Sequence, residues 1–318
     1  MKKYKTAVVI PCYKVSSHIL KVIEGIGPEV QKIYVVDDCC PENSGELVKN
    51  NSRDKRVEII YHSENRGVGG AVISGYKKAL TDEMDVIVKI DGDGQMDTSR
   101  IKDLIAPIIS GSSDYTKGNR FHELSDLESM PKLRLIGNAF LALTTKFSSG
   151  YWTIFDPTNG FTAISTEALR KLDLNKINER YFFESDMLFR LNLIKAVVKD
   201  VAMPAQYGGE ISNLKIINTL WKFPLLNLRN FLKRIFYTYY LRDMSPASIQ
   251  FFFGNILFAF GVIFGGYHWY RNSHSHIPTP LGTIMLSTIT IILGVQFLIG
   301  WITQDMNSVP SSPLTRWR

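Results

Sequence analysis

Two long apolar runs near the C-terminal end constrain this chain more than any other feature. Residues 249–269 and 281–301 contain no Asp, Glu, Lys or Arg and are rich in Phe, Ile, Leu, Val and Gly. A helix of about 21 residues reaches about 30 Å, which matches the hydrocarbon layer of a membrane. We therefore predict two membrane-spanning helices. The alternative is a helical hairpin buried in a soluble domain.

The segment between the two runs, residues 271–280, is short, so both outer ends of the hairpin face the same side of the membrane. It carries Arg271 as its one fixed charge. The basic residues that flank the hairpin are Lys215, Lys222, Arg229, Lys233, Arg234, Arg242, Arg316 and Arg318. Because positive charge stays on the cytoplasmic side, we expect residues 1–243 and the C-terminal tail there. The first ten residues lack the long apolar core of a signal peptide. The sequence does not distinguish a bacterial or archaeal inner membrane from an endoplasmic reticulum membrane.

Residues 214–241 alternate large apolar side chains with Lys, Arg and Asn. This pattern is typical of helices that lie in the membrane interface and meet anionic lipid head groups with their basic residues. The alternative is an ordinary amphipathic helix packed on the soluble domain. We thus expect four parts, namely a domain of residues 1–210, juxtamembrane helices in 211–245, a two-helix hairpin in 246–304 and a tail of 305–318.

The first part alternates short β-rich runs with helical patterns. The predicted strands are residues 7–10, 33–36, 57–61 and 86–90, and the predicted helices are residues 19–26, 70–80 and 101–109. This rhythm predicts an α/β fold with a mostly parallel sheet and helices on both faces. Ligands of such sheets bind at the carboxyl ends of the strands. The polar residues at those ends include Pro11, Tyr13, Asp38, Arg66, Asp91 and Asp93.

Charge and cysteine content exclude several protein classes. Lys and Arg outnumber Asp and Glu by 37 to 30, which favours an anionic partner. The basic cluster adjoins the apolar runs, so a nucleic acid is a poor candidate. Cys12, Cys39 and Cys40 form neither a disulfide framework nor a zinc pattern, so we expect a reducing compartment. Buried packing is favoured over thiol reactivity for these cysteines.

The segment Val86 to Gln95 ends a buried strand with two carboxylates, Asp91 and Asp93. Oxygen ligands at this spacing suit Mg²⁺ or Mn²⁺, which would also bridge a diphosphate. A plain Asp-Gly turn is the competing interpretation. A calcium loop fails, because Met96 and Lys102 stand where Gly and Glu are needed. A dinucleotide fold or P-loop fails, because residues 67–72 lack the third spaced Gly and no Gly-Lys-Ser/Thr follows.

Six short segments follow one another in an order that is specific as a set. They are residues 8–13 (VVIPCY), 35–38 (VVDD), 65–71 (NRGVGGA), 91–95 (DGDGQ), 118–121 (GNRF) and 155–161 (FDPTNGF). With them the chain resembles the family 2 glycosyltransferases of the GT-A fold, in the polyprenyl-phosphate glycosyltransferase group that includes dolichol-phosphate mannose synthase. The resemblance covers most of the chain, and the paired C-terminal spans resemble the members with their own membrane anchor. It implies that residues 1–210 are a GT-A catalytic domain.

The resemblance implies a nucleotide diphosphate sugar lying across the strand ends. Pro11, Tyr13 and Asp38 would lie near the base and ribose, and Arg66 and Asp91 would also contact the nucleotide sugar. Asp91, Asp93 and Gln95 would hold the metal, Mg²⁺ or Mn²⁺. The family usually continues Asp-Asp with Gly-Ser, whereas this chain has Cys39 and Cys40 there. That departure leaves the local turn and the base preference open.

For a lipid phosphate acceptor, the nucleophilic oxygen is already anionic, so positioning matters more than a strong base. Arg120 and Arg134 are candidates for holding the lipid phosphate, with solvated surface charges as the alternative. Asp156 lies in a Pro- and Gly-containing loop and is implied by the resemblance as base or orienter. Glu184 and Asp186, which we expect at the start of a helix, are its rivals. Turn capping for Asp156 and helix-terminus charge for the other two are the competing interpretations.

We predict a metal-dependent inverting glycosyltransferase that moves a hexose from an NDP-sugar, with UDP-glucose or GDP-mannose expected, to a polyprenyl phosphate. A processive synthase would carry Gln-x-x-Arg-Trp, but here Pro313 stands where Gln should be before Arg316 and Trp317. The alternatives are another membrane acceptor, such as a diacylglycerol or a lipid-linked glycan, and a catalytically silent nucleotide-sugar scaffold. The sugar, base, lipid length and oligomeric state are not predicted, and the membrane helices leave homo-oligomers open.

Overall fold

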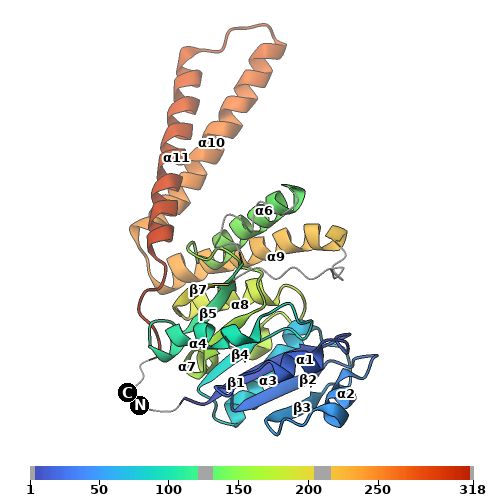
Figure 1. Cartoon of the computed structure of the whole chain (residues 1–318). Coiled ribbons are helices and arrows are strands. Elements are labelled where there is room, and N and C mark those ends of the chain that lie inside the picture. Colours follow the sequence, from blue (N-terminus) through green and yellow to red (C-terminus); the bar gives the residue numbers. More distant parts are fainter. Residues whose placement is uncertain (1–3, 121–131, 204–215, 316–318) are drawn as a thin grey trace. The chain divides into compact units, whose positions relative to one another are not determined.

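A seven-stranded sheet forms the centre of the first of two units (Figure 1). The computed structural model describes residues 4–120, 132–203 and 216–315, with side chains from residue 137 in the second range and from residue 222 in the third. The strands are β1 (Thr6–Cys12), β2 (Lys32–Asp37), β3 (Val57–Tyr61), β4 (Val86–Lys89), β5 (Tyr115–Asn119), β6 (Thr162–Ser165) and β7 (Val198–Ala202). Their order is β3-β2-β1-β4-β6-β5-β7, and β6 runs antiparallel to both neighbours. The predicted α/β fold with a mostly parallel sheet is confirmed.

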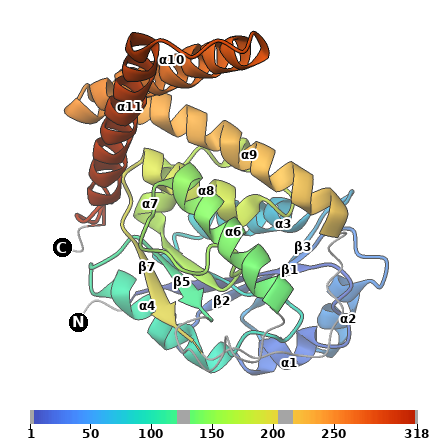
Figure 2. The ribbon, with the colours of Figure 1, turned by 90° about the horizontal axis from the view of Figure 1, so that it is seen from above.

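Ten α-helices are described. They are α1 (Ile19–Glu24), α2 (Ser44–Asn51), α3 (Val68–Thr81), α4 (Ile101–Ile109), α6 (Lys132–Ser149), α7 (Thr166–Lys171), α8 (Phe183–Leu193), α9 (Ile216–Phe236), α10 (Pro246–His274) and α11 (Leu281–Asn307). Two short 3₁₀ helices at Thr98–Arg100 and Leu174–Lys176 and a π-helical turn at Tyr237–Arg242 complete the described helical structure. Figure 2 shows the same ribbon from above.

The alternation of side chains along β1 explains why helices cover both sheet faces. Val8 and Ile10 point into an apolar core that also takes buried residues from α1 and α4. Val9 points to the other face, where α3 packs. Gly75 of α3 approaches Val9 so closely that a Cβ atom there would overlap its side chain. Successive side chains of a strand point to opposite faces, so this near-continuous apolar strand is buried on both sides.

The carboxyl ends of β1, β2, β3 and β4 meet at one edge of the sheet. In the parallel register, Cys12 pairs with Asp37, and Asp37 pairs with Tyr61. Strand β4 pairs with β1 on the other side, with Lys89 opposite Val9. The polar segments that follow these strands therefore converge, as the sequence predicts.

The second unit, residues 233–309, contains the hairpin of α10 and α11. Both helices are long and apolar enough to cross a membrane by length and composition, and they contain the two predicted spans. Within this unit the Asp305 carboxylate is fully buried. It accepts hydrogen bonds from Arg234 at 2.6 and 2.9 Å and from the Tyr239 hydroxyl at 2.5 Å. A buried ion pair with this many hydrogen bonds fixes a geometry rather than adding much net stability.

The chain returns to the first unit after the hairpin, since residues 310–318 belong to that unit. The buried Asp114 carboxylate accepts backbone N–H groups from Leu314 at 3.0 Å and Thr315 at 2.9 Å. It also accepts the Thr315 hydroxyl and the backbone N–H of Val197. The C-terminal segment is thereby held beside the start of β5.

Candidate active site

Two consecutive carboxylates end β2, and the first of them shapes the turn that follows. The Asp37 side chain accepts the backbone N–H of Cys40 at 2.7 Å and that of Gly45 at 2.6 Å. Cys39 adopts a positive φ of 53° between them. This conformation suits Gly better than Cys, which explains why a glycine is typical at this point. The Asp37 contacts keep the turn closed despite the cysteine.

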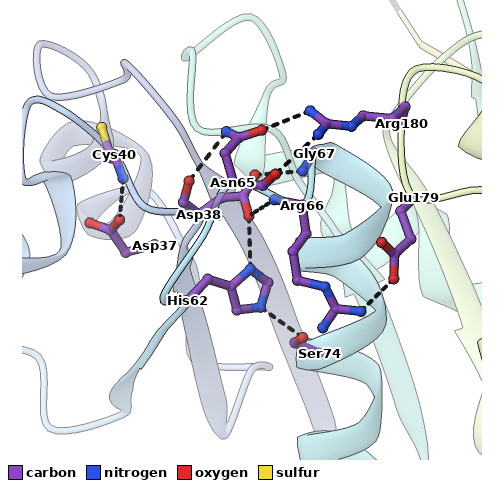
Figure 3. Close-up of polar contacts among 10 residues, drawn as sticks. All are labelled: Asp37, Asp38, Cys40, His62, Asn65, Arg66, Gly67, Ser74, Glu179 and Arg180. Atoms are coloured by element: carbon purple, nitrogen blue, oxygen red, sulfur yellow. Dashed lines mark hydrogen bonds and ion pairs between the residues drawn. The ribbon is translucent and has the colours of Figure 1, made fainter.

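Asp38 holds the loop that precedes α3 (Figure 3). Its carboxylate accepts the backbone N–H of Arg66 at 2.8 Å and that of Gly67 at 2.7 Å, and it contacts His62 Nδ1 at 2.8 Å. The other ring nitrogen of His62 contacts the Ser74 hydroxyl at 2.8 Å. Gly67 has a φ of 87°, which the loop requires and which Gly adopts without strain. Asp38 is only 2% exposed, so its main contacts are with this loop.

The same loop is tied to the segment before α8. Arg66 pairs with Glu179, and Arg180 donates to the Asn65 side chain at 2.8 Å and to its carbonyl at 3.1 Å (Figure 3). Gly69 permits this approach, because a Cβ atom there would clash with the chain at Asn178 and Glu179. The Arg66 guanidinium thus lies at the strand ends and has a fixed partner.

A buried lysine connects the end of β4 with α8. Lys89 is fully buried, and its Nζ lies 2.8 Å from Asp91 Oδ1 and 3.0 Å from Glu184 Oε1. Burial lowers the pKa of Lys89, but Asp91 and Glu184 together raise it above its ordinary value. Gly160 packs against this cluster, and a Cβ atom there would lie 2.6 Å from Lys89 Nζ. The ammonium is therefore enclosed, with one carboxylate from the segment after β4 and one from α8 beside it.

The carboxylates of the predicted metal site are more exposed than Lys89. The side chain of Asp91 is 30% exposed, Asp93 is partly exposed with one oxygen accepting the Gln95 N–H at 3.0 Å, and Gln95 is exposed. Among the described residues no group of three or more His, Cys, Asp or Glu side chains could hold a metal. Two carboxylates and an amide are a hard-oxygen donor set, and Mg²⁺ is commonly held by one or two carboxylates plus substrate phosphates. The residues present fit such an ion when a diphosphate completes its coordination.

The loop of residues 155–161 positions Asp156, as predicted, outside any helix. Asp156 is fully buried and accepts Arg120 Nε at 2.8 Å and Nη2 at 3.3 Å. Arg120 keeps part of its side chain exposed, 34%, at the end of β5. Arg134 belongs to α6, but its side chain lies outside the part of the structure that is described.

Two further charged groups, the buried Lys117 and the half-buried Asp200, contact this loop. Lys117 donates to the carbonyl of Asn159, and Asp200 accepts the Phe155 N–H at 2.8 Å. Burial lowers the pKa of Lys117 to about 8, against the opposing effects of Glu184 and Asp156. Burial raises the pKa of Asp200 to about 6, although the Phe155 N–H and Lys117 both favour its charged form.

The two acidic residues of α8 have different surroundings. They lie in the first turn of the helix, as the sequence predicts. Asp186 accepts the Asn178 N–H at 2.9 Å, Arg190 Nε at 2.8 Å and the Asn230 amide at 3.0 Å. Those contacts connect α8 with α9. Glu184 contacts Lys89 instead and thus lies close to the carboxylates that follow β4.

The remaining residues that were predicted to contact the nucleotide sugar belong to β1 and to the segment directly after it. Pro11 is buried within β1, and Tyr13 directly after the strand is 45% exposed. The Sγ of Cys40, itself buried, accepts the Lys14 N–H at 3.1 Å and so joins the segments after β1 and β2. Sequence reasoning predicted Pro11 and Tyr13 but named none of Lys89, Lys117 and His62. Lys117 and His62 stand outside the six short segments, and Lys89 lies in the apolar run before Asp91.

Several known proteins are similar to this chain in sequence. The family model described as glycosyl transferase family 2 matches residues 7–173. UDP-N-acetylglucosamine–dolichyl-phosphate N-acetylglucosaminyltransferase of Methanococcus voltae is 30% identical over 212 residues, covering 61% of this chain and 84% of that protein. Dolichol-phosphate mannosyltransferase of Pyrococcus furiosus is 30% identical over 185 residues, covering 57% and 51%.

Among solved structures, the fold is similar to that of glucosyl-3-phosphoglycerate synthase from Mycobacterium tuberculosis, solved with Mn²⁺, UDP and phosphoglyceric acid. The TM-score is 0.53 at 16% identity, covering 73% of this chain and 78% of that one. At this identity the likeness establishes the shared fold alone.

Proposed function

The chain belongs to glycosyl transferase family 2, and we propose that it moves one sugar from a nucleotide diphosphate to a polyprenyl phosphate at a membrane surface. One observation carries the proposal. One chain combines two apolar helices with two groups of charged residues at its strand ends. These groups are the carboxylates of Asp91 and Asp93 and the ion pair of Arg120 with Asp156. Relatives at 30% identity are named for dolichyl phosphate acceptors, one with N-acetylglucosamine and one with mannose. The identity of the sugar stays open between such donors.

On the donor side, Pro11, Tyr13 and Arg66 are proposed to contact the nucleotide, with Asp38 acting through the loop that it holds. Asp91, Asp93 and Gln95 would hold Mg²⁺ or Mn²⁺. That ion would supply Lewis-acid stabilisation of the diphosphate leaving group. The residues themselves orient the diphosphate across the ends of β1, β2 and β4, since each lies on or directly after one of those strands or in the loop before α3.

On the acceptor side, Arg120 is proposed to bind the lipid phosphate, with Arg134 as its companion. Asp156 would orient the Arg120 guanidinium, because both of its oxygens accept from that group. The acceptor oxygen is already an anion, so we infer that attack needs alignment rather than a strong base. Asp186 is the weakest candidate for a base, since it already accepts hydrogen bonds from three partners. By its family, the enzyme is expected to invert the anomeric centre.

Helix α9 supports a membrane location for the acceptor. Its exposed face carries Leu225, Leu228, Leu232 and Phe236, each more than half exposed. Its buried face carries Asn227 and Asn230, which bond to Ser148 and Asp186. A helix that buries amides and exposes large apolar side chains suits an interface with acyl chains. We infer that the first unit and the tail face the cytoplasm. Cysteine labelling of residues 275–280 from the cytoplasmic side alone would contradict this topology.

The test is transfer of labelled sugar in detergent or vesicles with Mg²⁺ or Mn²⁺. Donors are UDP-glucose, UDP-N-acetylglucosamine and GDP-mannose, and acceptors are undecaprenyl or dolichyl phosphate. The control acceptors are the same polyprenols without phosphate, and a diacylglycerol. We expect a labelled lipid from polyprenyl phosphate only. Labelled diacylglycerol would replace the proposed acceptor, and metal-dependent nucleotide binding with no transfer to any acceptor would favour a silent scaffold.

A further inference from the structure

The ammonium group of Lys89 lies against Asp91, one of the carboxylates proposed to hold the metal. We propose that Lys89 is a positioning residue that holds one oxygen of Asp91, so that the protein alone binds a divalent cation weakly and a nucleotide diphosphate must complete the site. This inference rests on the proposed function, since it takes Asp91 and Asp93 as the metal-holding carboxylates.

The geometry places Lys89 in direct competition with a metal for Asp91. Lys89 is the last residue of β4, and Asp91 follows it by two positions. Lys89 Nζ lies 2.8 Å from Asp91 Oδ1, so the two side chains form a close ion pair. A divalent cation bound by Asp91 therefore has an ammonium as its close neighbour, and like charges at such separations repel strongly away from bulk water.

The ammonium cannot leave. Lys89 is fully buried, and its second partner, Glu184, lies 3.0 Å away on α8. On a third side, Gly160 of the Asp156 loop approaches the ammonium closely, because a Cβ atom there would lie 2.6 Å from Nζ. Moving Lys89 away would leave Glu184, whose side chain is only 13% exposed, without this partner, which is costly. Lys89 thus remains beside Asp91 during any binding event.

The other proposed metal ligands are the second oxygen of Asp91, the carboxylate of Asp93 and the amide of Gln95. Asp93 already accepts the Gln95 N–H with one oxygen, and no cluster of three acidic, His or Cys ligands occurs among the described residues. A diphosphate would add both negative charge and hard oxygen ligands. Lys89 therefore couples metal binding to donor binding.

The experiment measures Mn²⁺ binding to the purified full chain in detergent, by electron paramagnetic resonance of free Mn²⁺, with and without UDP or GDP. For wild type we expect weak binding that either nucleotide strengthens roughly tenfold or more. Lys89→Met, which keeps the side-chain length and removes the charge, should bind Mn²⁺ roughly tenfold more tightly without nucleotide, with a smaller gain from nucleotide.

The matched variant is Glu184→Gln, which leaves Lys89 with Asp91 as its sole carboxylate partner in the cluster. Its nucleotide-free Mn²⁺ affinity should stay equal or fall. Opposite directions for the two variants are expected from charge competition, whereas general damage to the site weakens binding in both. If Lys89→Met does not fold, as judged by thermal unfolding, Lys89→Met in the Glu184→Gln background replaces it and should bind Mn²⁺ more tightly than Glu184→Gln alone.

A folded Lys89→Met protein that binds Mn²⁺ no better than wild type overturns the inference about Lys89. The proposed function fails in a different way, since wild-type protein would then bind no Mn²⁺ with either nucleotide, or would bind it and transfer no sugar. The metal titration thus separates the two.

Discussion

At the scale of single residues, the site depends on buried charges whose roles differ. Asp38 and Asp37 are adjacent in the chain, yet Asp37 closes a turn and Asp38 holds a loop from the next βα connection. Asp91 and Asp93 reach the surface, whereas Lys89 behind them is enclosed. These assignments lead to two measurements.

Replacing Asp38 with Asn should loosen the loop before α3. The Asp38 carboxylate contacts the N–H groups of Arg66 and Gly67 and the ring of His62. In the variant, the NH₂ group of Asn would face one of these three hydrogen-bond donors and could not accept from it. A mismatched buried hydrogen bond costs about 1–3 kcal/mol, and we expect the KM for the donor to rise roughly tenfold. Ser74→Ala, which removes only the outer partner of His62, is the control and should change KM less. An unchanged donor KM in Asp38→Asn would show that the loop does not serve the donor.

Asp200→Asn should change how stability depends on pH. The pKa of Asp200 rises from 3.8 to about 6 in the folded protein. Between these values the folded state keeps a proton that the unfolded chain has lost, so wild-type stability falls as pH rises from about 4 to 6. Asn does not titrate and still can accept the Phe155 N–H. The variant should therefore gain about 2 kcal/mol relative to wild type across this window, measured by denaturant unfolding. A difference that does not vary with pH would disprove the shift.

Motifs predicted the carboxylates better than their partners. Asp91, Asp93 and Asp156 stand in short segments with turn residues, which sequence reasoning recognises. Lys89 stands in an apolar strand where alternation predicts a core side chain, and one of its two carboxylate partners, Glu184, comes 95 positions later. Such a pairing depends on tertiary contacts and leaves no local pattern.

At the scale of elements, the first four strands were predictable and the last three were not. Strands β1 to β4 are apolar runs separated by helical patterns. Strands β5, β6 and β7 have four or five residues each and contain Lys, Thr, Asn or Asp. They are stabilised by pairing across long separations, so propensity alone does not identify them. The same strands carry Lys117 and Asp200, which explains why these residues were missed as well.

The contact between the C-terminal segment and β5 makes Asp114 a test of element packing. Asp114→Ala would remove the acceptor of three backbone N–H groups, from Val197, Leu314 and Thr315, and one acceptor of the Thr315 hydroxyl. We expect the free energy of unfolding of the first unit to fall by about 3 kcal/mol or more. Asp103→Ala, an exposed carboxylate paired with Arg100 three residues away, is the control and should change it by about 0.5 kcal/mol or less. Equal effects would mean that the segment is not held there.

The hairpin of α10 and α11 depends on a close approach at Gly294. A Cβ atom at this position would lie 2.6 Å from the Phe258 backbone nitrogen, so Gly294→Ala must push the two helices apart. Small residues allow membrane helices to pack closely, and we expect a loss of about 1–3 kcal/mol, measured as a lower Tm in detergent. Gly266→Ala is the matched control, because nothing lies within 4 Å of its Cβ position. It should raise the Tm slightly through helix propensity. A lowered Tm in both variants would argue against this packing.

At the scale of the whole molecule, the chain leaves the first unit once and comes back to it. The hairpin of residues 233–309 is inserted between the α/β unit and the segment 310–318 that contacts Asp114. Hydrophobic length predicted both long helices of the hairpin, which are long and apolar enough to cross a membrane. The division at residue 232 was not predicted, since α9 continues across it without a break in its amphipathic pattern.

The most direct test of the central claim is sugar transfer to polyprenyl phosphate by wild type and Asp93→Asn under identical conditions. Both proteins should be recovered from the membrane fraction in equal amount. We predict metal-dependent formation of a labelled polyprenyl phosphate sugar by wild type, and loss of about 100-fold or more in Asp93→Asn, because a metal ligand is replaced by a neutral group. Near-normal transfer by Asp93→Asn, or wild-type transfer that persists in excess chelator, would contradict a metal-held diphosphate at the end of β4.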